Sequence, residues 1–272
     1  MKTNHNLHLV SDSSGETVSG IMRACLVQYD GEEVTEHFWW LIRTQGQMNK
    51  VMEGIRNNPG LVIFTLLDIE TKKLLETECR RLAIPYVSAL DPVMSALEKF
   101  FNKAGGHEIG RQHNLTDDYF DRIEAMHFAL QHDDGQSLST LAEADIILLG
   151  VSRTSKTPTC MYLANKGFKV GNIPLVPGIV LSEQLFANTK ALIVGLTREP
   201  KSLSDIRQNR LRLMNEDKGI NYADVDSVKE EVATSKRLFG KNGWPIIDVT
   251  RKSIEETAAS IIQLYNSRFE RL

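Results

Sequence analysis

The chain has 272 residues, 42% of them hydrophobic and 25% charged, a composition typical of a globular protein and not of a disordered one. Its 32 basic and 35 acidic residues give a net charge of −3, which draws it neither to nucleic acid nor to an anionic membrane. No stretch reaches the roughly 18 consecutive apolar residues of a membrane span. The first ten residues contain no apolar run typical of a signal peptide. Three scattered cysteines, Cys25, Cys79 and Cys160, are typical of a reducing compartment, so we expect a cytoplasmic protein.

The first hundred residues alternate between short apolar runs and segments with helical periodicity. This alternation predicts parallel β-α-β units, with helices on the faces of the sheet. The stretch LVIFTLLD is a strong buried strand, and Pro92 is placed to open a helix in its first turn. The expected strands are residues 7–12, 34–42, 61–68 and 84–90, and the expected helices are residues 16–29, 45–57, 69–83 and 92–101.

The stretch NKAGGHEIGRQHN, residues 102–114, interrupts this alternation with three glycines and no periodicity. We interpret it as a linker between two domains. The fold class is therefore α/β, with a Rossmann-like N-terminal domain at residues 1–104 and a second α/β domain at residues 105–272. The second domain is expected to begin with a helix over residues 116–135, capped by Thr116 and terminated by Gly135.

The rest of the second domain follows the same alternating pattern. Its apolar run ADIILLG is short and almost free of polar residues, which predicts a buried strand. The expected strands are residues 144–150, 168–176, 191–197 and 244–250, and the expected helices are residues 157–167, 202–215, 222–240 and 253–272.

The stretch GVSRTSKTPT follows the strand ADIILLG directly and precedes a helix. It matches the phosphate-loop pattern G-x-x-x-x-G-K-[ST], except that Ser155 stands where the second glycine is expected. Such a loop turns backbone N–H groups toward an anion, while the lysine neutralises phosphate charge and the hydroxyl that follows it binds Mg²⁺. Glycine is favoured at the sixth position because it accepts a positive φ, and at Gly150 a chain reversal favours permissive dihedral angles. The predicted phosphate-binding residues are Gly150, Val151, Ser152, Arg153, Thr154, Ser155, Lys156 and Thr157, with Thr157 as the metal ligand.

A second polar cluster, QHDDG, lies just before this strand and contains His132, Asp133 and Asp134. Acidic side chains at the end of a helix meet the negative pole of its dipole, so their presence there requires a reason. They are interpreted in three ways that remain open at this point: as solvated acids, as a general base for a hydroxyl, or as ligands of Mg²⁺.

Several weaker candidates have structural explanations as well as functional ones. The loop SDSSGET follows the first strand, where α/β sheets bind ligands, but an N-cap turn with Ser13 or Ser14 explains it equally well. Asp68 ends an apolar strand and is better interpreted as a helix cap than as a metal ligand. Asp248 in WPIIDVT is a closer candidate for an acid near a metal. The basic run from Arg207 to Lys218 is typical of a solvated helix face, or else contacts phosphate or an acidic partner.

Six motifs in order along nearly the whole chain, VSDSSGETV, HDDG, GVSRTSKTPT, KVGNIPLV, GLT and NYA, resemble one family. It comprises the regulatory proteins of pyruvate, phosphate dikinase, with those of phosphoenolpyruvate synthase as close relatives. The resemblance implies a serine/threonine kinase that uses ADP to phosphorylate and inactivate the dikinase, whose neighbouring catalytic histidine must carry a phosphate. It also implies the reverse activity, in which inorganic phosphate removes the threonine phosphate and pyrophosphate is released.

The same resemblance implies roles for individual residues. Residues 150–157 hold ADP or inorganic phosphate, Lys156 neutralises charge, and Asp134 is the base for the target threonine, with Mg²⁺ expected as cofactor. Some family members have a lysine where this chain has Gln131, so we expect Arg153 or His132 to supply the missing charge. A homodimer is also implied.

Three alternatives remain beside this interpretation. In the first, the same chemistry acts on phosphoenolpyruvate synthase, although the motif SDSSGET favours the dikinase as the partner. A phosphate-loop kinase for a small metabolite would prefer ATP and turn over without a protein substrate. A nucleotide-sensing regulator without catalysis would inhibit the dikinase without changing its mass, but a sensor has no need of the HDDG base.

Overall fold

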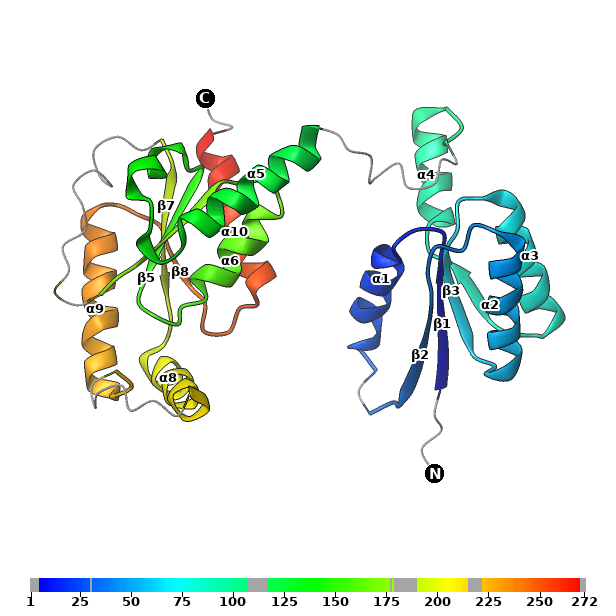
Figure 1. The fold of residues 1–272 in the computed structure, drawn as a ribbon, viewed down its shortest axis with the longest axis horizontal. Coiled ribbons are helices and arrows are strands. Elements are labelled where there is room, and N and C mark those ends of the chain that lie inside the picture. Colours follow the sequence, from blue (N-terminus) through cyan, green and yellow to red (C-terminus); the bar gives the residue numbers. More distant parts are fainter. Residues whose placement is uncertain are drawn as a thin grey trace. The chain divides into compact units, whose positions relative to one another are not determined.

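The computed structural model describes residues 5–29, 31–106, 117–176, 178, 190–214 and 222–269. The chain divides into two compact units, Met1–Asn114 and Leu115–Leu272. Each unit contains a four-stranded parallel sheet with helices packed against it (Figure 1). The α/β class is thereby confirmed. The domain boundary expected after residue 104 stays a prediction, since residues 107–116 lie outside the described residues.

The N-terminal unit alternates strand and helix as the sequence predicts. Its strands pair in parallel in the order β2-β1-β3-β4, so the chain starts at an inner strand and later crosses over it. The elements are β1 (His5–Ser11), α1 (Glu16–Leu26), β2 (Val34–Trp39), α2 (Gln45–Asn57), β3 (Leu61–Thr65), α3 (Ile69–Arg81), β4 (Tyr86–Ser88) and α4 (Asp91–Phe101).

Local side-chain chemistry sets where these helices begin. Thr44 forms a capping box with Gln47 at the start of α2, and the Asp68 carboxylate accepts the Thr71 N–H at 2.9 Å at the start of α3. The interpretation of Asp68 as a helix cap is therefore confirmed. The alternative in which Ser13 or Ser14 caps α1 is wrong, because Gly15 takes the N-cap position in a left-handed conformation without a side-chain hydrogen bond.

The C-terminal unit repeats the same strand order with a second sheet. Its strands pair in parallel as β6-β5-β7-β8, so β5 is an inner strand and the chain crosses over it between β6 and β7. The helices and strands are α5 (Asp117–Gln131), β5 (Ile146–Gly150), α6 (Lys156–Ala164), β6 (Val170–Pro174), β7 (Leu192–Thr197), α8 (Pro200–Met214), α9 (Val225–Lys241), β8 (Ile246–Asp248) and α10 (Ile254–Phe269), and two 3₁₀ turns, η2 (Asp133–Gly135) and η3 (Leu138–Glu143), join α5 to β5.

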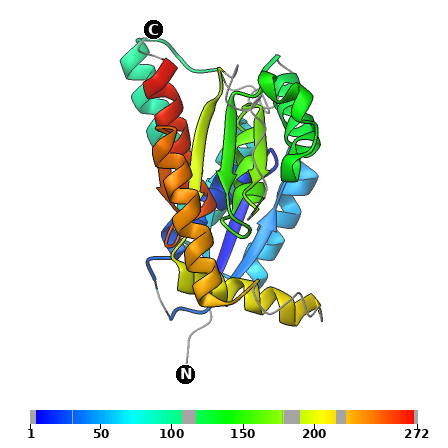
Figure 2. The same ribbon diagram turned by 90° about the vertical axis from the view of Figure 1, so that its left-hand side faces the viewer.

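Helices pack against the sheet of this unit (Figure 2), and buried side chains form a core on both of its faces. Side chains of α6 and α10 pack on one face, against Ile146, Leu148 and Val194, while Phe128 of α5 and Phe239 of α9 pack on the other. All residues of β5 are buried, which explains why its sequence is apolar throughout. Because the strands are parallel, their carboxyl ends meet at one edge, and the point between β5 and β7 is where such sheets bind ligands.

The helix before the first 3₁₀ turn differs from its sequence prediction. It ends at Gln131, four residues before the expected terminator Gly135, and Asp134 then adopts a left-handed conformation with φ 51°. The expected cap, Thr116, lies outside the described residues. The early end of α5 releases the DDG residues from the helix, so that they form a separate turn.

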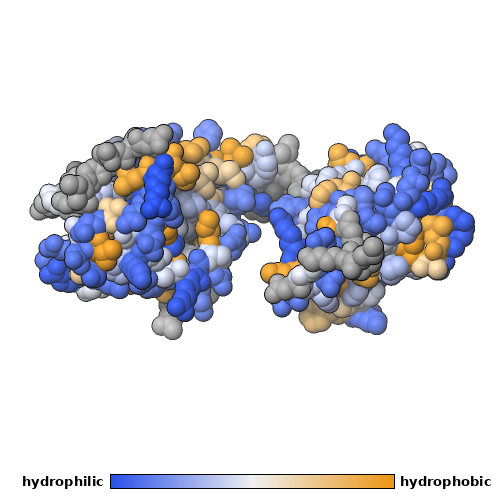
Figure 3. Space-filling model, turned by 90° about the horizontal axis from the view of Figure 1, so that it is seen from below, coloured by the Kyte–Doolittle hydropathy of each residue, from blue (hydrophilic) through white to orange (hydrophobic). Residues whose placement is uncertain are grey.

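Exposed apolar side chains occur on α4 and α5, and Figure 3 shows hydrophobic patches within the mainly hydrophilic surface. Phe100 of α4 is 80% exposed and Phe120 of α5 is 60% exposed. Within the described ranges, no helix combines the length and the apolar character that a membrane crossing requires.

Two helical glycines in the N-terminal unit allow a matched test of packing. A Cβ atom added to Gly54 of α2 would lie 2.4 Å from the indole of Trp39, whereas at Gly20 of α1 it would meet nothing within 4 Å. We expect Gly20→Ala to raise the free energy of unfolding by about 0.5–1 kcal/mol, and Gly54→Ala to lower it by about 1–3 kcal/mol, because the ring must move. Urea unfolding of the two variants measures both effects, and equal stability of the two would contradict the packing described.

Candidate active site

The candidate phosphate loop, residues 150–157, leaves β5 at the sheet edge and leads directly into α6. Gly150 does not have the positive φ that would require glycine, so the expected dihedral reason is wrong. Glycine is needed instead for close approach, because an added Cβ would lie 2.7 Å from both the Leu196 carbonyl oxygen and Thr154 Oγ1. The loop therefore begins in contact with the neighbouring strand β7.

Two left-handed residues, Arg153 with φ 74° and Ser155 with φ 61°, shape the rest of the loop. Ser155 occupies the position where glycine is usual, and its positive φ is the conformation for which glycine is favoured there. Ser155 is also the N-cap of α6 and makes no capping hydrogen bond with its side chain. Among the described residues no side chain caps this end, so the N–H groups of Lys156 and Thr157 are available to an anion, as at other helix N-termini that bind phosphate.

Lys156 is the buried cation of this loop, with 6% of its surface exposed. Its Nζ donates to the Val151 carbonyl at 3.1 Å, and the Thr154 hydroxyl donates to the same oxygen at 2.9 Å. Burial lowers the pKa of Lys156 to about 8, against the opposing attraction of the Asp134 and Asp133 carboxylates. The ammonium group is thus held at low hydration against the Val151 carbonyl of the loop, where a bound phosphate would stabilise its charge.

Asp133 of the DDG turn is joined directly to the loop. Its Oδ1 accepts the Thr157 hydroxyl at 3.0 Å and also accepts the Asn172 side-chain amide, which in turn donates to Thr157 Oγ1 at 3.0 Å. The backbone N–H of Asn172 donates to the His132 carbonyl at 2.9 Å, which fixes the turn against β6. The structure therefore brings together two sequence candidates, Asp133 and Thr157, through Asn172, which the sequence interpretation did not single out.

Asp134 differs from Asp133 in its surroundings. Its side chain is exposed, and it acts on Lys156 through its charge. His132 is buried, with Nδ1 donating to the Phe128 carbonyl and Nε2 2.8 Å from Thr140 Oγ1, so both ring nitrogens are used within the turn. His132 therefore supports the DDG turn from inside, and the expectation that it or Arg153 replaces the charge missing at Gln131 stays a prediction.

Arg207 of α8 supports the loop from within the unit and is 1% exposed. Its Nη2 donates to Glu231 Oε2 at 2.8 Å and to the Ser152 carbonyl at 3.3 Å, while its Nη1 donates to the Tyr222 carbonyl at 2.8 Å. The Tyr222 hydroxyl lies 3.1 Å from Ser152 Oγ. The interpretation of this run as a solvated face is therefore wrong for Arg207, which holds the backbone of the loop.

Asp248 ends β8, and β7 lies between that strand and β5. Its Oδ1 accepts the Thr250 N–H at 2.9 Å and the Thr250 hydroxyl, so it closes its own turn. Among the described residues no hydrogen bond joins it to the phosphate loop. Its role as an acid near a metal stays a prediction.

The loop SDSSGET lies at the equivalent edge of the first sheet, between β1 and β3. Here the buried Asp12 carboxylate accepts the Leu67 N–H at 2.6 Å, and burial is the main cause that raises the pKa of Asp12. A carboxylate built into this edge disfavours a bound anion, so phosphate binding is better supported at the second sheet.

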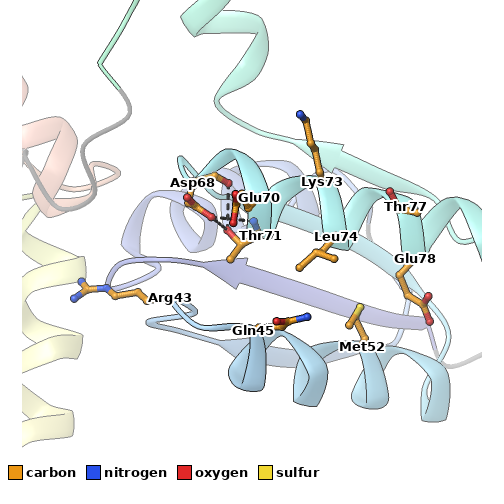
Figure 4. A pocket seen from close by; sticks show the side chains of 10 residues that line it. All are labelled: Arg43, Gln45, Met52, Asp68, Glu70, Thr71, Lys73, Leu74, Thr77 and Glu78. Atoms are coloured by element: carbon orange, nitrogen blue, oxygen red, sulfur yellow. Dashed lines mark hydrogen bonds between the residues drawn. The ribbon is translucent and has the colours of Figure 1, made fainter.

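The N-terminal unit also contains an open cavity of about 780 Å³ beside α2 and α3 (Figure 4). Met52 and Leu74 line it with apolar surface, and Arg43 and Lys73 are offset by acidic side chains, including Asp68 and Glu78. None of the predicted site residues lies in it.

The fold defines an α/β protein with parallel sheets, a class in which ligands usually bind at the carboxyl ends of the strands, where the loop lies. The model of one family, described as kinase/pyrophosphorylase, matches residues 7–262, and the chain belongs to this family.

Relatives from three bacteria are each named "Putative pyruvate, phosphate dikinase regulatory protein". The protein of Paramagnetospirillum magneticum is 55% identical, covering 98% of this chain and 86% of its own length. That of Rhodospirillum rubrum is 55% identical, covering 95% of this chain and 94% of its own, and that of Erythrobacter litoralis is 47% identical, covering 100% and 98%. The resemblance stated from the motifs is confirmed, and the family description indicates a phosphotransferase.

Burial of Lys156 predicts a pH-dependent cost in stability. Its folded pKa of about 8 lies below the ordinary value of 10.5, so between these pH values the unfolded chain holds a proton that the folded chain has released. Stability from this group therefore rises with pH across that window. We expect Lys156→Met to be more stable than the wild type by about 1–3 kcal/mol at pH 7, with a gap that narrows toward pH 10.5. Chemical unfolding from pH 7 to 10.5 measures this, with exposed Lys201→Met as the control, and a variant less stable at pH 7 would contradict it.

The left-handed backbone at Ser155 predicts that glycine is tolerated better than alanine. Both substitutions remove the hydroxyl, but only Ser155→Gly removes the Cβ atom that is unfavourable at φ 61°. We expect Ser155→Gly to be more stable than Ser155→Ala by about 1 kcal/mol, allowing for the greater freedom of glycine in the unfolded chain. The measurement is urea unfolding of both variants, and a higher stability of the alanine variant would show that the loop adopts another conformation.

Proposed function

We propose that this protein is a bifunctional regulator of pyruvate, phosphate dikinase. In one direction it transfers the β-phosphoryl group of ADP to a threonine hydroxyl of the dikinase, which yields phosphothreonine, AMP and a proton. In the other direction inorganic phosphate attacks that phosphothreonine, which restores the hydroxyl and releases pyrophosphate. The names of the relatives and the family description support this activity.

The observation that carries the proposal is the hydrogen bond of 3.0 Å between Thr157 Oγ1 and Asp133 Oδ1. It attaches the DDG turn to a loop with open N–H groups and a buried lysine. An acid that can receive a proton and a cradle that can hold a phosphoryl group are thereby kept on one sheet edge. Phosphoryl transfer depends on this kind of positioning and charge neutralisation more than on covalent help from the protein.

Asp134 is the proposed general base, as the resemblance to the family implies. Its exposed carboxylate is open to a protein substrate, whereas the Asp133 carboxylate is engaged by Thr157 and Asn172. Asp134 takes the proton of the threonine hydroxyl in the forward reaction and returns it in the reverse one. Lys156 and the N–H groups of the loop hold the outer phosphate of the donor, or the attacking phosphate.

The oxygens around Thr157 are suited to Mg²⁺, a hard cation that prefers carboxylate, hydroxyl and phosphate oxygens. Asp133 and Thr157 are the proposed protein ligands, and Asn172 Oδ1 is a buried oxygen without a partner among the described residues. Within that part of the chain no three His, Cys, Asp or Glu side chains gather into a metal cluster, so phosphate oxygens would complete the shell. Bound Mg²⁺ would neutralise charge on the transferring phosphoryl group.

The proposed reaction is tested by the mass of the dikinase. Purified pyruvate, phosphate dikinase, charged with phosphate on its histidine, is incubated with this protein, Mg²⁺ and either ADP or ATP, each free of the other. We expect one added phosphate on threonine with ADP alone, and its removal, with release of pyrophosphate, when inorganic phosphate is added. Asp134→Asn should retain nucleotide binding and slow transfer by about 10²-fold or more. Its control is Asp226→Asn, an exposed acid on α9.

Each other outcome points to a specific alternative. Phosphate added with ATP alone would show that ATP, and not ADP, is the donor. Phosphate added only to phosphoenolpyruvate synthase would show that this enzyme is the partner. Turnover of a small metabolite without either protein would favour a metabolite kinase. Inhibition of the dikinase without a change in its mass would favour a sensor without catalysis. Normal turnover by Asp134→Asn would remove Asp134 as the base.

A further inference from the structure

Arg198 is a cation at the site that the sequence interpretation did not single out. It is the first residue after β7, the strand paired with β5, and therefore lies at the edge from which the phosphate loop emerges. Its Nη2 donates to Ser155 Oγ at 3.3 Å, so its guanidinium group reaches the N-terminus of α6. The hydroxyl of Ser155, at the position where glycine is usual, thus holds Arg198 against the loop.

Among the described residues, the side chain of Arg198 has one hydrogen bond, to Ser155. Its Nε is buried and has no partner among the described residues. Within the same part of the chain, the Arg198 guanidinium forms no ion pair. Against the opposing effect of burial, hydrogen bonds from Thr250 and the charge of Arg198 lower the pKa of Asp248, but the Asp248 carboxylate is engaged by Thr250. A buried guanidinium N–H without an acceptor is rare in folded proteins and points to a ligand or an ordered water.

Arg207 provides an internal comparison. It also has an unpartnered Nε, but its charge is neutralised by the carboxylate of Glu231, and its remaining nitrogens donate to backbone carbonyls. Arg207 is therefore accounted for as a support of the loop. Among the described residues Arg198 forms no ion pair of this kind, and Asp248, the carboxylate that feels its charge, is engaged by Thr250, so the charge of Arg198 is available to an anion at the N-terminus of α6.

We propose that Arg198 binds the second phosphoryl group of a diphosphate whose first phosphoryl group lies in the loop beside Lys156. This inference rests on the proposed function, in which a diphosphate is present in both directions, as ADP before forward transfer and as pyrophosphate after the reverse reaction. A single phosphate is satisfied by the open N–H groups and Lys156. A planar guanidinium that presents several N–H groups is suited to a neighbouring phosphate.

The consequence is a preference for diphosphate over monophosphate that depends on Arg198. Lys156 contributes to the affinity of both anions, because it faces the phosphate that they share. Arg198 contributes to the affinity for pyrophosphate and little to the affinity for inorganic phosphate. The ratio of the two dissociation constants therefore separates the two residues.

Calorimetric titration of the whole chain with inorganic phosphate and with inorganic pyrophosphate, at one Mg²⁺ concentration, tests this. For Arg198→Gln we expect pyrophosphate affinity to fall by about 10- to 100-fold and phosphate affinity by less than about three-fold. Arg198→Lys should recover part of the loss. Arg237→Gln, which removes an exposed arginine on α9, should leave both affinities unchanged, and Lys156→Met should weaken both anions.

Two results would overturn the inference. If Arg198→Gln weakens both anions equally or neither, while Lys156→Met weakens both, the loop binds phosphate as proposed and Arg198 has no part in diphosphate recognition. If the wild-type protein binds neither anion, the proposed function fails and this inference fails with it. Circular dichroism spectra and melting temperatures of the Arg198 variants establish that any loss arises in a folded protein.

Discussion

The close contact between Gly150 and β7 is the constraint on which the candidate site depends. An added Cβ atom would lie 2.7 Å from the Leu196 carbonyl oxygen, so the loop leaves β5 against its neighbouring strand. From that starting point, two left-handed residues turn the chain into α6, which carries Lys156 at its first position. The loop is then held by Arg207 and by Asp133, through contacts from α8 and the DDG turn.

The buried charge of Lys156 lowers the stability of the protein. Lys156 is almost fully buried, and its charge is opposed by desolvation more than it is helped by the two aspartates. Neither aspartate forms an ion pair with it among the described residues, where its Nζ donates to the Val151 carbonyl. In the proposed function, a bound phosphate would add the negative charge that stabilises the Lys156 ammonium, and such a cost in stability is usual at functional sites.

The sequence predicts the elements well because apolar strands and capped helices are encoded locally, as LVIFTLLD and the Asp68 cap illustrate. It also predicts the loop, since a strand, a short polar motif and a helix follow one another in the chain. Asn172 and Arg198 are separated from the loop in sequence and join it only when β6 and β7 pair with β5. Their signal was weak: a polar residue inside the strand KVGNIPLV and a lone arginine after GLT. The burial of Arg207 could not be predicted, because it lies in a run of basic residues. The sequence of such a run does not show which of its residues pairs with a carboxylate on another helix.

The two sheets share one strand order but differ in the charge at their crossover points. In the first sheet Asp12 places a buried carboxylate across the gap between β1 and β3, whereas in the second Lys156 places a buried cation beside β5. Two sheets with the same strand order would by themselves provide two equivalent nucleotide-binding sites. The opposite charges remove this equivalence, so the stoichiometry of nucleotide binding that follows from the proposed site is one per chain, with the N-terminal unit free for a different task.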